Sequence, residues 1–94
     1  MSELPPVELL EATHQFPGQF VFKAIGRGDE RFVAEIVAAI RSELDHEFDS
    51  PYELTHSSKG KHVSVTITPW VETAVQVLAV YARLQTIDGV AFVL

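Results

Sequence analysis

Hydrophobic positions along the chain repeat with two periods, one typical of strands and one typical of helices. The clearest strand pattern covers residues 63–68, where Val63, Val65 and Ile67 alternate with serine and threonine side chains. The segments 20–25 and 90–94 are rich in apolar strand formers, and 52–56 alternates as a half-buried strand does. The pattern therefore predicts four strands over these ranges.

Between the strands, apolar residues recur with helical spacing in two segments. Asp29 precedes the first as an N-cap, and its apolar stripe consists of Val33, Ile36, Val37, Ile40 and Leu44. The second covers about 70–85 and is preceded by Thr68 as an N-cap and by Pro69 at the first helical position. The spacing predicts two helices, each connecting two strands.

The order of these elements is βαββαβ, with the two halves joined by a hairpin. Because crossover connections are right-handed, this order favours a four-stranded antiparallel sheet, in strand order 4-1-3-2, with both helices on one face. The predicted fold class is therefore α+β, a ferredoxin-like sandwich. Residues 19–94 form the predicted domain, and residues 1–18 form a leader with a short helix at about 7–12.

Charge and composition restrict the classes of function. The chain of 94 residues carries 13 acidic and 7 basic residues, a net charge of −6, and no cysteine. The negative charge opposes binding to nucleic acid or to an anionic membrane, and the lack of cysteine excludes disulfides and thiolate chemistry. No signal segment opens the sequence and no apolar run is long enough to cross a bilayer. We therefore expect a cytoplasmic protein.

Several short motifs follow one another along residues 15–94. They are Phe16-Pro17, Phe20-x-Phe22-Lys23-x-Ile25-Gly26, Ser57-Ser58-Lys59-Gly60-Lys61, Ser64-Val65-Thr66-Ile67, then Tyr81, Leu84, Ile87-Asp88-Gly89-Val90 and Val93-Leu94. In these motifs the chain resembles the YbeD-like family of small uncharacterised bacterial proteins. The resemblance implies an ACT-like fold and a role in regulation or in sensing a small ligand, with lipoate as one suggested ligand.

The loop after the first strand is the candidate ligand site. Gly26 and Gly28 allow close backbone approach, and Asp29 begins a helix whose N-terminal N–H groups attract anions. Lys23 lies in the preceding strand and is expected on the open face of the sheet. The resemblance to ACT-type domains implies a small carboxylate effector here, an amino acid or a lipoate-like acid. The alternative is that these glycines only form the turn and that Asp29, which would repel a carboxylate, only caps the helix.

The second candidate site is the basic hairpin, which consists of Ser57, Ser58, Lys59, Gly60, Lys61 and His62. Its lysines either hold an anion or an acidic partner protein, or form only a solubilising turn. Lys59-Gly60 also resembles the start of an RNA-recognition signature. The aromatic positions of that signature are filled here by Lys61, Val63 and Thr66, so RNA binding is not expected.

Residues for catalysis or metal binding do not form a recognisable set. His56 and His62 flank the hairpin turn, and a pair of histidines across the strands would begin a metal site, but no third ligand is in register, so surface imidazoles are expected. Ser57 or Ser58 beside His62 lacks an orienting acid and an oxyanion hole. We therefore expect no metal site, no cofactor and no enzymatic activity.

The second helix and the last strand carry more apolar residues than one sheet face buries. The last strand is also an uncharged sheet edge, which favours strand pairing. Either residues 1–14 cover these surfaces or two copies associate, and we expect a homodimer. Two functions follow as hypotheses: a non-catalytic, ACT-like regulator that senses a ligand, or an adaptor that binds a partner protein through the hairpin 57–62, the second helix and the edge strand.

Overall fold

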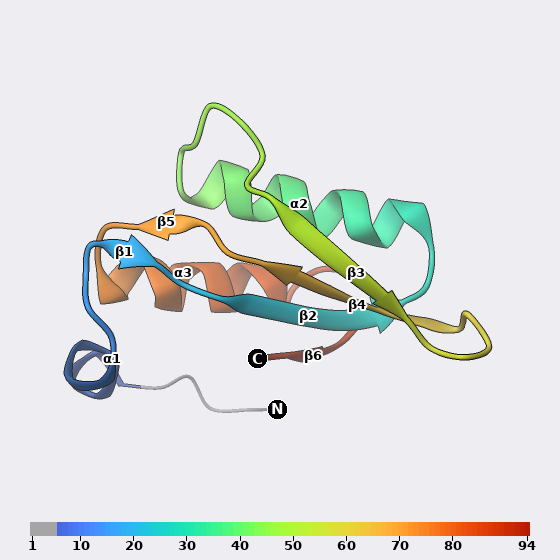
Figure 1. The fold of residues 1–94 in the computed structure, drawn as a ribbon, viewed down its shortest axis with the longest axis horizontal. Coiled ribbons are helices and arrows are strands. Elements are labelled where there is room, and N and C mark those ends of the chain that lie inside the picture. The colour runs from blue at the N-terminus through green and yellow to red at the C-terminus, as the bar shows by residue number, and fades with distance from the viewer. Residues whose placement is uncertain (1–5) are drawn as a thin grey trace.

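The computed structural model describes residues 6–94 and has an α+β fold, which confirms the predicted class (Figure 1). Its elements in chain order are α1 (Val7–Thr13), β1 (Gly18–Gln19), β2 (Phe22–Arg27), α2 (Glu30–Glu43), β3 (Tyr52–His56), β4 (His62–Ile67), β5 (Trp70–Val71), α3 (Ala74–Leu84) and β6 (Val90–Val93). Strands β1 and β5 were not predicted. The other elements fall close to the predicted ranges.

Four strands form the main sheet, in the order β3-β4-β2-β6, and every neighbouring pair is antiparallel. Numbered as the four predicted strands and read from the β6 edge, this order is 4-1-3-2. In the central pair, Phe22 lies opposite Ile67 and Lys23 opposite Thr66. Helices α2 and α3 both lie on one face of this sheet (Figure 1).

The segment after β4 differs from the prediction. Residues 70–71 form β5, which pairs with β1 in a separate two-stranded sheet, and α3 begins only afterwards. Thr73, not Thr68, caps α3, because the Thr73 hydroxyl accepts the N–H of Gln76 at 3.2 Å. Val71 is fully buried. Pairing residues 70–71 as a strand therefore satisfies their backbone and completes the core, which outweighs the local helix-start signal.

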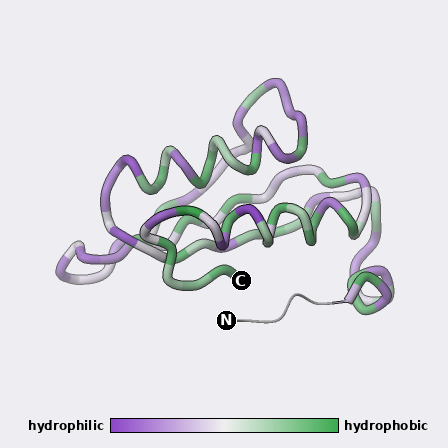
Figure 2. Tube along the Cα trace, turned by 180° about the vertical axis from the view of Figure 1, so that it is seen from behind, coloured by the Kyte–Doolittle hydropathy of each residue, from purple (hydrophilic) through white to green (hydrophobic). Residues whose placement is uncertain are grey.

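The hydrophobic core fills the space between the main sheet and its two helices. The sheet contributes alternate residues of β2 and β4, because successive side chains of a strand point to opposite faces. Fully buried members of this core are Phe22, Ile36, Ile40, Val63, Val65, Ile67, Val77, Val80 and Leu84. Figure 2 shows the same division, with hydrophobic positions along α3 and the C-terminal strand and hydrophilic ones along the hairpin.

Helix α1 covers part of the apolar surface of α3. Leu10 is buried in the core, Val7 packs against it, and α1 contacts α3. One of the two expectations was that residues 1–14 cover the apolar surfaces, and residues 7–13 do cover part of α3. Residues 1–5 lie outside the described part of the chain. The β6 edge is not covered in this way, since Phe92 and Leu94 are 64% and 62% exposed.

Candidate functional site

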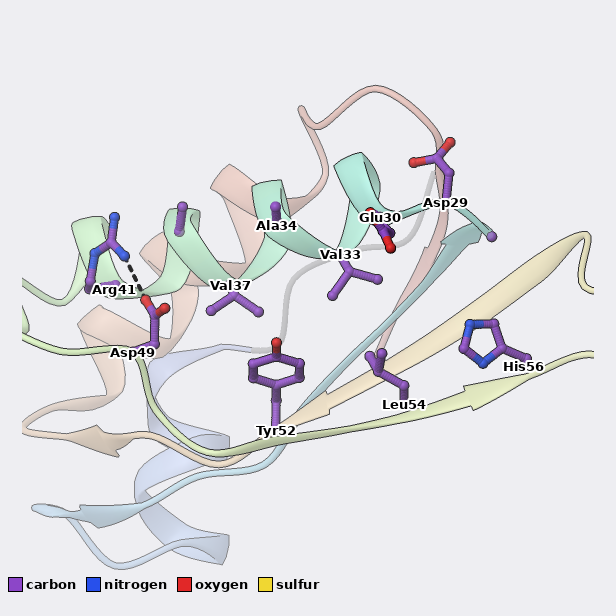
Figure 3. Close-up of a pocket in the computed structure, with 12 residues that line it drawn as sticks. Asp29, Glu30, Val33, Ala34, Val37, Arg41, Asp49, Tyr52, Leu54 and His56 are labelled. Atoms are coloured by element: carbon purple, nitrogen blue, oxygen red, sulfur yellow. Dashed lines mark hydrogen bonds and ion pairs between the residues drawn. The ribbon is translucent and has the colours of Figure 1, made fainter.

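A groove of about 930 Å³ lies between helix α2 and strand β3 (Figure 3). Tyr52, Leu54 and His56 form its strand wall, and the side of α2 that carries Val33 and Val37 forms its helix wall. The groove arises because β3 is an outermost strand, whereas α2 packs over β4 and β2. Tyr52 and Leu54 therefore remain 45% and 42% exposed although they share the helix-covered face of the sheet.

The two ends of the groove carry different polar groups. At one end, the Arg41 guanidinium donates from Nη1 to Oδ1 of Asp49 at 2.6 Å. At the other end stand Asp29 and Glu30, at the start of α2 (Figure 3). Three carboxylates therefore face one guanidinium along the lining, so the groove has an apolar middle and a net acidic rim.

The ion pair at the Arg41 end is open to exchange. The side chains of Arg41 and Asp49 are 40% and 48% exposed, and exposed ion pairs of this kind contribute about 0–1 kcal/mol. An incoming carboxylate can therefore replace Asp49 at small cost, because the planar guanidinium donates N–H groups to both oxygens of a carboxylate.

The four predicted ligand residues are separated in the structure. Gly28 and Asp29 line the groove, whereas Lys23 lies on the opposite, open face of the sheet, in register with Thr66. Gly26 lies beneath the Phe32 ring, where an added Cβ would stand 2.5 Å from Cζ. Gly26 is thus required for packing, and Lys23 and Gly26 do not contribute to the groove.

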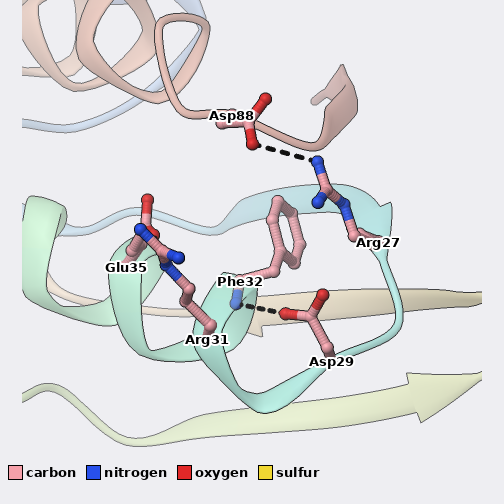
Figure 4. A network of polar contacts seen from close by, with 6 residues as sticks. All are labelled: Arg27, Asp29, Arg31, Phe32, Glu35 and Asp88. Carbon is pink, nitrogen blue, oxygen red and sulfur yellow. Dashed lines mark hydrogen bonds and ion pairs between the residues drawn. The ribbon is translucent and has the colours of Figure 1, made fainter.

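Polar groups of the loop between β2 and α2 are hydrogen-bonded within the protein (Figure 4). The Gly28 N–H donates to the Lys61 carbonyl oxygen at 3.0 Å, and the Asp29 N–H donates to the Arg27 carbonyl oxygen at 2.9 Å. The Asp29 carboxylate accepts the N–H of Phe32 at 2.8 Å, as predicted for an N-cap. The loop therefore contributes to a ligand site by its position at the end of the groove, and not through the N–H groups of residues 28 and 29.

The basic hairpin is a tight turn at the end of β3 and β4. Gly60 adopts a φ of 71° and donates its N–H to the Ser57 carbonyl oxygen at 2.9 Å. Ser57 in turn accepts the N–H of His62 on its hydroxyl at 3.2 Å. Lys59 and Lys61 are exposed. The hairpin thus presents two ammonium groups beyond the sheet.

His56 and His62 do not approach each other across the strands, and both are exposed. His56 lies opposite Val63 in the β3–β4 ladder and shares the helix-covered face with it. His62 precedes Val63 in β4, so its side chain points to the other face. Within residues 6–94, no three His, Asp or Glu side chains are arranged to hold a metal ion.

Tyr81 belongs to an aromatic cluster beside the core. Its ring packs edge-on against Phe22 with centroids 5.3 Å apart, and against Phe20 at 6.4 Å. Burial raises the pKa of the Tyr81 phenol. Tyr81 is not among the residues that line the groove, so this shift reflects packing.

The groove itself was not foreseen from the residue pattern. The alternation of residues 52–56 predicts a half-buried strand, but it does not specify which helix covers that strand. A signal was nevertheless available, because strand order 4-1-3-2 places 52–56 at an edge. A helix that packs over the central strands leaves the inner face of an edge strand less covered, so apolar residues on that face indicate a groove.

Fold and groove together define a class of protein: a small α+β domain with an open groove between a helix and an edge strand. A family model described as a protein of unknown function, DUF493, matches residues 11–94. The chain belongs to this family and is similar to UPF0250 proteins, so its resemblance to the YbeD-like family is confirmed.

The relatives match nearly their whole length. A UPF0250 protein of Pasteurella multocida is 32% identical over 89 residues, which covers 95% of this chain and 99% of the relative. A UPF0250 protein of Shewanella amazonensis is 31% identical over 80 residues, covering 85% of this chain and 89% of its own. One of Shewanella baltica is 34% identical over 79 residues, covering 84% and 88%. Within residues 6–94, no helix has the length and apolar character needed to span a membrane.

Proposed function

We propose that the protein is a small, non-catalytic regulatory module of the ferredoxin-like, ACT-like type, which senses an amphipathic carboxylate in the groove between α2 and β3. The observation that supports this proposal is the apolar middle of the groove with Arg41 at one end. The apolar part of a lipoate-like acid or an apolar amino acid lies between Val33, Val37 and Leu54. Its carboxylate binds Arg41, because Asp29 repels it from the other end.

Asp49 acts as an internal competitor for this ligand. It occupies the guanidinium of Arg41, at 2.6 Å, whenever the ligand is absent. Replacing Asp49 by the isosteric asparagine leaves the groove shape and removes the competing charge. Asp49→Asn should therefore bind carboxylates more tightly, whereas Arg41→Gln should bind them more weakly.

Thermal unfolding with octanoate, lipoate or single amino acids tests the proposal. A ligand at ten times its dissociation constant adds about 1.4 kcal/mol to the free energy of unfolding. For a domain of this size that raises Tm by roughly 5–10 °C. The rise should be larger for Asp49→Asn and smaller for Arg41→Gln at equal ligand concentration. No rise in Tm from any of these carboxylates, in the wild type and in Asp49→Asn, would rule out carboxylate sensing.

A second candidate function is that of an adaptor, and the open β6 edge favours it. Phe92 and Leu94 are exposed on a strand that carries no side-chain charge, and such edges promote strand pairing between chains. In this function two copies pair through β6, while Lys59 and Lys61 of each hairpin contact an acidic partner.

Sedimentation velocity tests the β6 dimer, and capture of a partner protein tests the hairpin. The wild type should sediment as a dimer and Phe92→Glu as a monomer, since two glutamates would repel each other across the paired edges. A wild type that stays monomeric at high concentration excludes the β6 dimer. Partner capture by Lys59→Glu/Lys61→Glu that equals capture by the wild type excludes the hairpin as a docking site.

A further inference from the structure

Within residues 6–94, the outer edge of strand β3 pairs with no other strand, and its backbone groups lie along the groove. The Ser57 N–H donates to the His62 carbonyl oxygen at 3.0 Å, which makes residues 57 and 62 a hydrogen-bonded pair. Hydrogen-bonded pairs alternate along an antiparallel ladder, so residues 53 and 55 also face β4. The N–H and C=O groups of Tyr52, Leu54 and His56 therefore point away from the sheet, at its outer edge.

The same three residues direct their side chains into the groove, opposite α2. A further strand added beside β3 would therefore place every second side chain on the helix-covered side, next to Val33 and Val37. An edge strand with a helix beside it is the arrangement by which several domains bind an extended peptide: main-chain hydrogen bonds supply affinity, and pockets for alternate side chains supply selectivity.

The rim charges favour a basic residue at one end of such a peptide. Asp29 and Glu30 stand at the end of the groove near His56, where β3 ends (Figure 3). Arg41, at the other end, is paired with Asp49. An added strand that runs antiparallel to β3 begins beside His56. Its first groove-facing side chain is therefore the one that meets the two carboxylates.

We propose that β3 accepts an extended segment of a partner polypeptide as an additional antiparallel strand. The segment carries apolar side chains at alternate positions and a Lys or Arg near its N-terminal end. This inference rests on the proposed function in using the same groove, and it adds the class of partner that the module binds. A second copy fits less well, because neither β3 nor β6, the two edges of the main sheet, contains a Lys or Arg.

Fluorescence anisotropy with the full chain and a labelled, amidated peptide, Lys-Thr-Val-Thr-Val-Thr, tests the inference. Its lysine and valines share one face of a strand, and saturable binding is expected. The same peptide with Glu in place of Lys should bind about two- to fivefold more weakly. Glu30→Lys, which places a lysine beside Asp29, should abolish this preference. Glu11→Lys, an exposed change on α1, is the matched control and should leave the preference unchanged.

Leu54→Pro tests the backbone contact. It removes the outward N–H while the bonds of residues 53 and 55 to β4 remain, and proline is tolerated on a strand edge in that position. Binding should fall about tenfold through loss of main-chain hydrogen bonds. Leu54→Ala removes most of the side chain but keeps the N–H, so it should bind the peptide more tightly than Leu54→Pro does. If Leu54→Pro does not fold, the charge reversal at Glu30 carries the test.

The outcomes separate this inference from carboxylate sensing. Absence of peptide binding, or binding that a folded Leu54→Pro retains in full, overturns strand addition. A dimer that dissociates in Leu54→Pro identifies a second copy as the occupant and also overturns it. Octanoate protection without peptide binding leaves only the proposed sensing function standing. Peptide binding without any carboxylate protection supports strand addition and refutes carboxylate sensing.

Discussion

Replacing Gly26 by alanine should destabilise the fold while leaving the groove surface intact. The added Cβ would stand 2.5 Å and 2.6 Å from Cζ and Cε1 of the buried Phe32 ring, and would also collide with the Gly89 carbonyl oxygen. That carbonyl accepts the Arg27 N–H at 3.1 Å and cannot withdraw without weakening the bond. Overpacking costs about 1–3 kcal/mol, and a weakened backbone hydrogen bond about 0.5–1.5 kcal/mol.

The expected total is a loss of about 2–4 kcal/mol in the free energy of unfolding. A domain of this size has about 5–14 kcal/mol in all, so the variant should still fold. With an m of about 2 kcal/mol per M in urea, the midpoint should fall by about 1–2 M. Intrinsic fluorescence of Trp70, the single tryptophan, reports the transition.

A double-mutant cycle with Phe32→Leu tests the cause. The smaller side chain removes the ring that the new methyl group meets, so the combined loss should be less than the sum of the two single losses by about 0.5 kcal/mol or more. Strict additivity would show that the ring is not the obstacle. A midpoint unchanged by Gly26→Ala would refute the packing role and return Gly26 to the candidate ligand residues.

Three further predictions concern the core, the sheet edge and alkaline pH. Leu10→Ala should cost about 2–3 kcal/mol, because the side chain is buried where α1 meets the core; an unchanged urea midpoint would mean that α1 unfolds separately. Removing Phe92–Leu94 should prevent folding, since Lys23 and Leu94 exchange two backbone hydrogen bonds; a truncated chain with the wild-type melting curve would contradict the topology. Because the pKa of Tyr81 is raised, the folded state holds the phenol proton more tightly than the unfolded state does. The contribution of this proton to the free energy of unfolding is therefore complete below about pH 10 and is lost as the pH rises through the folded-state pKa. Tyr81→Phe should remove that part of the alkaline loss in melts recorded across this range, and an identical pH profile would argue against the shift.

Local signals were sufficient where the structure depends on neighbouring residues. Asp29 caps α2 as predicted, because an N-cap acts on an N–H only three residues away. The alternation over Val63, Val65 and Ile67 became the buried face of β4, since one strand face packs against the helices. The order of the four main strands followed from the same elements, because right-handed crossovers leave few arrangements.

Features that depend on contacts between distant segments could not be predicted from the sequence pattern. Thr68 and Thr73 both carry an acceptable cap, and the choice is made by β1, a two-residue strand with no signal of its own. The groove depends on how far α2 lies from β3 across the sheet, which no periodicity specifies. Lys23 and Asp29, grouped as one site because they are close in the chain, lie on opposite faces of the sheet.

The contact between Gly28 and the hairpin joins the hairpin to the start of helix α2. The Gly28 N–H is held by the Lys61 carbonyl oxygen at 3.0 Å, and the Gly60 carbonyl fills the space that a side chain at position 28 would need. This hydrogen bond extends the β2–β4 ladder and joins the hairpin to Gly28, the residue that precedes the Asp29 cap of α2. Because Gly28 also lines the groove, the backbone of the hairpin sets the position of the acidic end of the groove.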